Sequence, residues 1–320
     1  MPPLAVFGFE LIGGDDARGF ARRLGAAMLA ADIAIALILL RTWGRGAAFR
    51  YWVIGTPLCL FIYLRIDLLS VLLAVIAVAV AKKRRSAAGP LLAAAVFVKV
   101  WPIILLPLLW IERAGKAFLA CLATLALSVV AWVWWGGVDG PIQVLTFRHS
   151  TGFEFQSPIG FLIWQLGRGQ LTDQGGSERV GSAPPAVTAS LALIIVFFAG
   201  WAWFRTANDP LTAEGLGSAV AVAALLVFSP AGSHQYLAWV LPWVAIADRA
   251  RLRDWTFIAT MSAVATALYA GRPIPYSYWI DVAALGVRNF ALVVVLIAGL
   301  AEIRRVDRSS AFRPTRVATG

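Results

Sequence analysis

The chain has 320 residues, of which 60% are hydrophobic and 14% charged, and its formal net charge is +11. Soluble domains average about 45–50% apolar and about 25% charged residues, and a single core of this size could not bury so much apolar surface. The composition therefore excludes a soluble globular protein and indicates an integral membrane protein. The basic residues lie in short loops between apolar runs, a pattern typical of cytoplasmic loops facing anionic lipid and not of nucleic-acid binding.

Apolar runs recur along the whole chain and predict membrane helices, each of which needs roughly 20 residues to span. The runs lie near residues 24–40, 51–64, 68–81, 86–110, 117–136, 186–204, 213–229, 235–248, 255–271 and 283–303. Several are short or interrupted by Pro or Gly, as in half-helices whose backbone is satisfied by protein or by a water-filled cavity. We expect an all-α polytopic transmembrane bundle of about 9–11 membrane segments, forming one integral membrane domain over residues 1–320 of a multi-pass cell-membrane protein.

The distribution of Lys and Arg predicts the orientation, because basic loops stay in the cytoplasm. The richest loops contain Arg41, Arg45, Arg50, Lys82, Lys83, Arg84, Arg85, Arg113, Lys116, Arg205, Arg249, Arg251, Arg253 and the tail 304–320. Keeping all of them inside makes 86–110 a re-entrant hairpin kinked near 99–102. A simple span at 86–110 would instead move every later loop to the other side. We prefer the hairpin, which places residues 1–23, 65–67, the long loop 137–185, 230–234 and 272–281 outside.

Three smaller features complete this topology. The mixed stretch 15–23 is interpreted as an external amphipathic interfacial helix, and 167–185 as a flexible external loop. The start has no signal-peptide pattern, and an external N-terminus suggests that a preceding helix is missing. Cys59 and Cys121 lie in apolar runs and are expected to be small buried residues, with neither a disulfide nor a metal site.

Ionisable side chains at membrane depth are costly and usually functional. Lys99, followed by Trp101 and Pro102, could bind a lipid phosphate, pair with a carboxylate across the bundle, or snorkel at an interface. Arg65 and Asp67 lie between two apolar runs with almost no loop. They are either functional or a local ion pair at a tight turn.

Two further stretches combine polar and aromatic residues. The first contains Arg148, His149, Glu154, Gln156 and Ser157, with Phe153, Phe155 and Phe161 around them; aromatic faces beside amides and carboxylates favour sugar recognition over a solvated loop. In the second, 229–239, His234 could titrate near neutral pH or belong to a capping turn. A fifth external group is formed by Arg272, Tyr276, Tyr278, Asp281 and Arg288.

Several of these segments resemble the motifs of one family. Lys99-Val100-Trp101-Pro102 is similar to the "K-x-aromatic-P" segment of polyprenol-phosphate-mannose-dependent mannosyltransferases, both glycosyltransferase family 87 and the GPI mannosyltransferase I family. The segment 64–69 resembles the "R-F-D-L-L" of family 87, and 153–157 resembles its "W-E-x-E-S" loop, with Phe153 for Trp and Gln156 for the second acid. The segment 229–242 resembles "S-P-Q-Y-x-x-W-x-x-P", split by Ala231 to His234, and the start at 2–5 resembles "Y-P-P-L".

The resemblance implies a GT-C fold and inverting transfer of a sugar, mannose in this family, from a polyprenyl-phosphate donor to a lipid or glycan acceptor on the extracytoplasmic face. Lys99, Arg65 and Arg148 would bind the donor phosphate, and Gln156, Ser157, Gln235 and Tyr236 the sugar or acceptor. The family's expected base, an acid before "Y-P-P-L", lies upstream of Met1, so the chain is truncated, mis-assigned at its start, or inactive. The remaining candidate bases are His234, Glu154 and Asp67.

We expect no cofactor, no metal and no nucleic-acid partner, only membrane lipids, the donor and the acceptor. Two alternatives remain open. A lipid-linked sugar flippase would use the same charges along a path through the bundle, and a non-catalytic membrane subunit would need no base.

Overall fold

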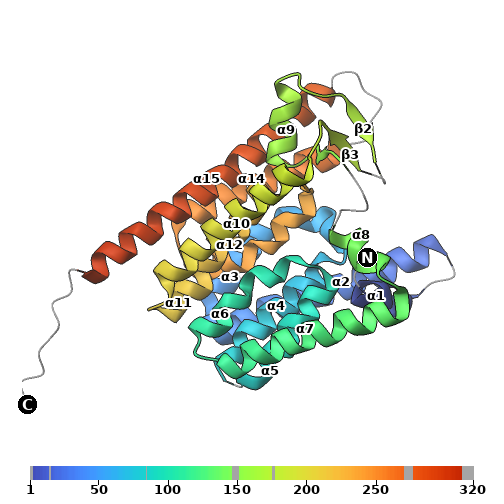
Figure 1. The fold of residues 1–320 in the computed structure, drawn as a ribbon. Coiled ribbons are helices and arrows are strands. Elements are labelled where there is room, and N and C mark those ends of the chain that lie inside the picture. Colours follow the sequence, from blue (N-terminus) through green and yellow to red (C-terminus); the bar gives the residue numbers. More distant parts are fainter. Residues whose placement is uncertain are drawn as a thin grey trace, which may run out of the picture.

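The computed structural model describes residues 3–13, 16–83, 85–145, 151–174, 177–269 and 277–311. In these ranges the chain is mostly helical (Figure 1), which confirms the predicted all-α polytopic membrane fold. Five described helices are long and apolar enough to cross a bilayer: Ala17–Trp43, Gly115–Gly136, Pro185–Thr206, Pro210–Phe228 and Val282–Val306. Four apolar helices are shorter: Pro3–Ile12, Asp67–Ala81, Ser86–Val98 and Trp101–Ile111.

The first half of the chain forms α1 (Pro3–Ile12), α2 (Ala17–Trp43), α3 (Arg45–Gly55), the 3-10 turns η1 (Thr56–Leu60) and η2 (Ile62–Leu64), α4 (Asp67–Ala81), α5 (Arg85–Val98), η3 (Trp101–Leu105), α6 (Leu106–Ile111), α7 (Gly115–Gly136) and α8 (Asp139–Leu145). The second half forms β1 (Phe153–Glu154), α9 (Pro158–Gln165), β2 (Leu171–Asp173), β3 (Glu178–Val180), α10 (Pro185–Thr206), α11 (Pro210–Thr212), the π-helical turn η5 (Ala213–Gly217), α12 (Ser218–Phe228), η6 (His234–Trp239), α13 (Leu241–Ala247), α14 (Ala250–Tyr269) and α15 (Ser277–Ala311).

The long helices divide into a central one and outer ones. In the span that includes α12, 78% of the apolar window is buried inside the protein, against 11% for α7 and 17% for α10. The outer helices therefore expose apolar side chains such as Leu127 and Val196. We assign these apolar surfaces to lipid. A helix can face lipid because its backbone N–H and C=O groups are hydrogen-bonded within the helix and need no water.

Predicted basic loops gather at one end of the bundle, where α6, α11 and the C-terminal part of α15 lie (Figure 1). At this end the Lys82 ammonium lies 2.8 Å from the carboxylate of Glu214, whose side chain is fully buried. The Trp43 indole donates to the same Glu214 oxygen. α8, α9 and the strands lie at the other end (Figure 1).

The segment 85–111 turns back on itself, as the predicted re-entrant hairpin requires. α5 begins just after Lys82, which pairs with Glu214 of η5, and α6 at the far end of the segment also packs against η5. The helical conformation is interrupted between α5 and η3, at residues 99–100. Close packing fixes the first arm, since a Cβ on Gly89 of α5 would stand 2.1 Å from the Ala117 carbonyl oxygen of α7.

Three expectations need correction. Residues 17–23 do not form a separate interfacial helix: they are the first turns of α2, whose N-terminus Asp16 caps by accepting from Gly19 N–H. The segment 167–185 is not simply a flexible loop, because β2 and β3 pair within it, and β1 completes an antiparallel sheet in the order β1-β3-β2. Cys59 is exposed and not buried, whereas Cys121 is buried as expected.

Candidate active site

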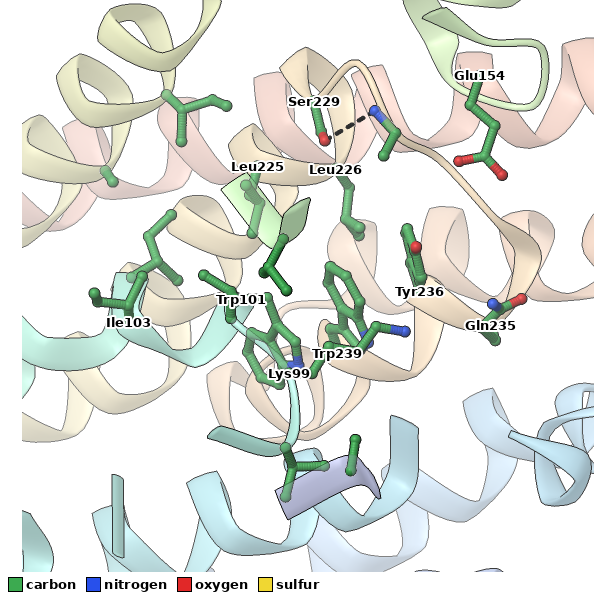
Figure 2. A pocket seen from close by; sticks show the side chains of 18 of the residues that line it. Lys99, Trp101, Ile103, Glu154, Leu225, Leu226, Ser229, Gln235, Tyr236 and Trp239 are labelled. Carbon is green, nitrogen blue, oxygen red and sulfur yellow. Dashed lines mark hydrogen bonds between the residues drawn. The ribbon is translucent and has the colours of Figure 1, made fainter. Parts of the chain in front are cut away.

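A cavity of about 810 Å³ opens between the two halves of the chain. Its lining residues come from α1, the break after α5, η3, α8, the small sheet, α10, α12 and η6. Figure 2 shows Ile103 and Trp101 toward one side of this cavity, and Tyr236, Gln235 and Glu154 toward the other. The cavity thus has an apolar and a polar part.

The apolar part lies between η3 and α6 on one side and α10 and α12 on the other. Its lining residues are Ile103, Ile104, Pro107, Ile195, Val196, Ala199, Gly200, Trp203, Leu225 and Leu226. Ile103 is 46% exposed and Val196 66% exposed, so the groove reaches the lipid-facing surface.

At the junction of the two parts, Lys99 is held by a carboxylate and two rings. Its ammonium lies 2.6 Å from Asp67 Oδ1, and the Trp239 indole donates to the same oxygen at 2.7 Å. The ammonium also lies 4.4 Å from the centre of the Tyr236 ring, and Trp101 stacks on Trp239 at 5.3 Å. Of the three sequence hypotheses for Lys99, the structure therefore supports pairing with a carboxylate across the bundle.

The ammonium keeps capacity for a ligand. It has three N–H donors, Asp67 is its one ion-pair partner among the described residues, and 25% of the Lys99 side chain is exposed. Asp67 itself is 2% exposed and does not line the cavity. Its Oδ1 accepts from both Lys99 and Trp239, so the geometry favours positioning of Lys99 over a role as base.

We infer the depth of the site in the membrane from the length of α4. α4 has 15 residues and at about 1.5 Å per residue is roughly 22 Å long, shorter than the hydrocarbon core of about 30 Å. Asp67 begins this helix, and its other end is followed by the basic residues Lys82 and Lys83. With those lysines at the headgroups, the Asp67–Lys99 pair lies below the opposite interface.

Glu154 lines the polar part, at the edge strand β1. Its backbone N–H donates to Pro230 O at 2.8 Å, and its carboxylate accepts from Gly232 N–H at 2.9 Å. Burial raises the pKa of the Glu154 carboxyl above its usual value, against the opposing effects of the Gly232 hydrogen bond and the nearby charges of Arg179, Arg288 and Lys99. A raised pKa is typical of carboxyls that accept protons near neutral pH.

Arg65 also lines the cavity, with an exposed side chain. It does not form the local ion pair with Asp67 considered from the sequence, because Asp67 pairs with Lys99. Among the described residues no carboxylate lies within ion-pair distance of Arg65. This guanidinium is therefore available to an anionic ligand.

His234 differs from the sequence expectation. Its Nδ1 lies 3.0 Å from the Arg288 guanidinium, and burial together with Arg288 and Arg65 lowers its pKa to about 3. The imidazole is thus neutral, does not titrate near neutral pH, and is absent from the cavity lining. Both observations disfavour His234 as the base.

Arg288 connects the polar loops. The side chain is 2% exposed and donates to the carbonyl of Gln156 and to the Asn289 side chain at 2.8 Å. It therefore holds the loop after Glu154 against the turn that contains His234. Of the fifth external group, Arg288 alone can be placed, since Arg272 and Tyr276 and the side chains of Tyr278 and Asp281 lie outside the described residues.

The proposed sugar or acceptor residues separate into two sets. Gln235 and Tyr236 line the cavity, and Gln235 accepts from the Ser233 hydroxyl at 2.5 Å. Gln156 and Ser157 do not line it. Ser157 is fully buried and caps α9 by accepting from Gly160 N–H at 3.0 Å, so its role is structural. Arg148, the third predicted phosphate ligand, and His149 lie outside the described residues.

The aromatic residues of the loop were expected to grip a sugar, and this is also corrected. Phe155 packs against Phe161 and Trp164 within the 151–181 segment, and Phe153 is 3% exposed. The aromatic lining comes instead from Trp101, Trp203, Tyr236 and Trp239.

Sequence reasoning missed one charged residue of the cavity. Arg179 of β3 lies opposite Glu154 in the antiparallel register, and its side chain is buried and lines the cavity. Nothing in the local sequence marks this residue, because its position depends on the pairing of two very short strands.

Comparison with family profiles decides the classification. The profile of glycosyltransferase family 87 matches residues 20–230, which is more than half of the chain. The chain belongs to glycosyltransferase family 87. The match covers Arg65, Lys99, Glu154 and Arg179 and ends within the turn that precedes η6. Searches of curated proteins and of solved structures gave no match.

Membership of family 87 indicates a membrane glycosyltransferase, which agrees with the cavity chemistry. The donor lipid, the sugar and the face of the membrane are finer questions that the family assignment leaves to the site. The described residues contain no cluster of three or more His, Cys, Asp or Glu that could hold a metal ion, and the absence of a metal in catalysis stays a prediction.

Proposed function

We propose that this family 87 enzyme transfers a sugar from a polyprenyl-phosphate donor to a lipid or glycan acceptor on the extracytoplasmic face, with inversion at C1. The observation that carries the proposal is the continuity of one cavity, in which a lipid-facing apolar groove leads to Lys99 and then to Glu154. Mannose as the sugar rests on the motif resemblance alone.

The donor fits this cavity in one orientation. The polyprenyl chain would occupy the groove between Ile103 and Val196, which opens to lipid. The phosphodiester would then lie at the junction, where the Lys99 ammonium has free donors and Arg65 has no carboxylate partner among the described residues. Charge-assisted hydrogen bonds of this kind are stronger than neutral ones.

The chemistry then needs one base. The acceptor oxygen attacks C1 of the sugar, the bond from C1 to the phosphate oxygen breaks, and polyprenyl phosphate leaves with both electrons. The acceptor proton passes to Glu154, the one candidate base that lines the cavity. A positioned general base contributes about 10²–10⁴-fold to the rate.

The extracytoplasmic face is supported by the charge distribution. The basic loops lie at the end of the bundle that contains Lys82 and Glu214. The strands β2 and β3 lie at the opposite end (Figure 1), and Glu154 belongs to β1, which pairs with β3. By the positive-inside rule the cavity mouth faces away from the cytoplasm. The cavity's ionisable residues concentrate at one end, as expected for an enzyme and not for a flippase path.

The test is sugar transfer in proteoliposomes from radiolabelled polyprenyl-phosphate mannose to extracted membrane lipids, with polyprenyl-phosphate glucose as the comparison donor. Glu154→Gln should lower transfer by about 10²–10⁴-fold while donor binding persists. Glu178→Gln, which removes an exposed carboxylate from the neighbouring strand, is the matched control. Wild-type protein that transfers neither sugar, or Glu154→Gln protein as active as wild type, would refute the proposal.

A further inference from the structure

The part of the cavity wall formed by the β2–β3 hairpin contains a buried cation that has no ion-pair partner among the described residues. Arg179 is 6% exposed, and no carboxylate among the described residues lies within ion-pair distance. Glu154 lies opposite it in the β1–β3 register, yet the Glu154 carboxylate binds Gly232 N–H instead. Burying a guanidinium that touches no anion is costly, and the Glu154 carboxylate acts on Arg179 only from beyond ion-pair distance, so this arrangement points to a ligand that supplies negative charge in direct contact.

The hydrogen bonds of Arg179 lead to the same conclusion. One terminal nitrogen donates to Gly152 O at 2.8 Å, while Nε is buried without an acceptor. A guanidinium has five N–H donors, and holding one backbone carbonyl would need a single neutral donor. The structural contact therefore leaves most of the capacity of Arg179 unused.

A second polar atom nearby is also unpartnered. The hydroxyl of Ser177, two residues before Arg179 on the β2–β3 hairpin, is buried without a hydrogen-bond partner. Both residues line the cavity, together with Gln174 of the same hairpin. Unsatisfied buried polar groups are rare in native proteins and call for an explanation, and two from one hairpin in one cavity wall indicate a common ligand.

We propose that Arg179 and Ser177 form an oxyanion-binding subsite that takes a phosphate group, with the guanidinium as the charged donor and the hydroxyl as the neutral one. Planar guanidinium donors match the spacing of phosphate oxygens. The subsite lines the same cavity as Glu154, which is the register partner of Arg179, so it holds either the phosphate of the donor or a phosphate carried by the acceptor. The inference rests on the proposed function only in assuming that the cavity receives phosphate-bearing lipids.

Equilibrium binding to the full-length protein in phosphatidylcholine nanodiscs tests this subsite without turnover. The probes are a polyprenyl monophosphate, the corresponding polyprenol without phosphate, and phosphatidylinositol. Arg179→Gln should weaken binding of a phosphate probe by about 10- to 100-fold, the usual worth of hydrogen bonds between charged partners, and leave polyprenol binding unchanged. Ser177→Ala should weaken the same probe by a smaller factor.

The arms distinguish the two sources of phosphate. Loss confined to polyprenyl monophosphate assigns the subsite to the donor, and loss confined to phosphatidylinositol assigns it to the acceptor. Arg168→Gln is the matched control, since it removes an exposed arginine of the same segment that does not line the cavity. Arg179→Lys keeps the charge without the fork and should retain part of the affinity, which serves if Arg179→Gln does not fold.

Wild-type affinity for both phosphate probes in the folded Arg179 variants would overturn the subsite. Phosphate binding that needs Arg179 in a protein without transfer activity would retain the subsite and reject the proposed function. If Arg179→Gln protein instead binds the phosphate probes normally and transfers sugar at the wild-type rate, the proposed function is retained and the subsite is rejected.

Discussion

Removing the Lys99 ammonium tests both the packing and the donor site. Lys99→Met leaves the Asp67 carboxylate, 2% exposed, with the Trp239 indole as its remaining partner. Breaking a buried ion pair by removing one partner costs about 3–5 kcal/mol. Because 25% of the Lys99 side chain is exposed, part of the lost interaction is screened by solvent, and we expect the lower end, about 3 kcal/mol.

The double variant Asp67→Asn/Lys99→Met separates stability from binding. It removes both charges, so no carboxylate is left buried and unpaired, and we expect it to be about 2 kcal/mol more stable than Lys99→Met alone. Donor binding should not recover, since the phosphate loses the ammonium in both variants. The free energy of unfolding can be measured by SDS titration in mixed micelles, and donor binding with polyprenyl monophosphate.

Two results would contradict this reasoning. If the double variant is no more stable than Lys99→Met, the pair carries no coupling energy and Asp67 is not held by Lys99 in the folded protein. If the double variant instead regains wild-type donor affinity, Lys99 does not bind the phosphate.

Further predictions concern the base and the cavity walls. Because the pKa of Glu154 is raised above 4.5, transfer should increase as pH rises through that higher value in a pH–rate profile, and the charged form should lower stability over the same window, so stability falls as pH rises. His234→Asn should keep transfer within about tenfold of wild type and leave the pH profile unchanged near pH 6–7, since a neutral imidazole has no titration there; a lost limb would restore His234 as the base. Gly232→Ala should reduce transfer strongly, because a Cβ would stand 2.5 Å from Ser157 Cα, whereas Gly25→Ala, with nothing within 4 Å, should be silent in the same assay. Gly200→Phe should weaken binding of long polyprenyl phosphates but spare a short-chain analogue, and equal loss for both would argue against a tail in the groove.

Hydropathy alone located the long helices. The predicted runs 117–136 and 186–204 correspond to α7 at Gly115–Gly136 and α10 at Pro185–Thr206, because a lipid-facing helix must be apolar along its whole length. The basic loops likewise predicted that 86–110 would return to its starting side. Such properties are local in the sequence and need no knowledge of packing.

The site depended on contacts between distant residues, which single motifs do not reveal. The sequence predicted that His234 titrates near neutral pH, because its contact with Arg288, 54 residues later in the chain, is not visible in the local sequence. Lys99 was singled out from the sequence, but its partner Asp67 lies 32 residues earlier. Trp239, which donates to the same Asp67 oxygen, is 172 residues from Asp67. Arg179 could be found only from the register of β1 and β3, since strands of two and three residues have no detectable alternation of polar and apolar side chains.

The shared oxygen of Asp67 also bears on how the chain enters the membrane. α4 and α5 are consecutive. Asp67 begins α4 and Lys99 follows the last residue of α5, so the two charges stand at the same end of this helical pair. An isolated charge costs about 2.5–3.5 kcal/mol on insertion at the centre of a membrane helix, which is the upper limit for these two residues at helix ends. Insertion of α4 and α5 together, already paired, avoids exposing either charge to lipid, so biogenesis should treat the two helices as one unit released from the translocon in a single step.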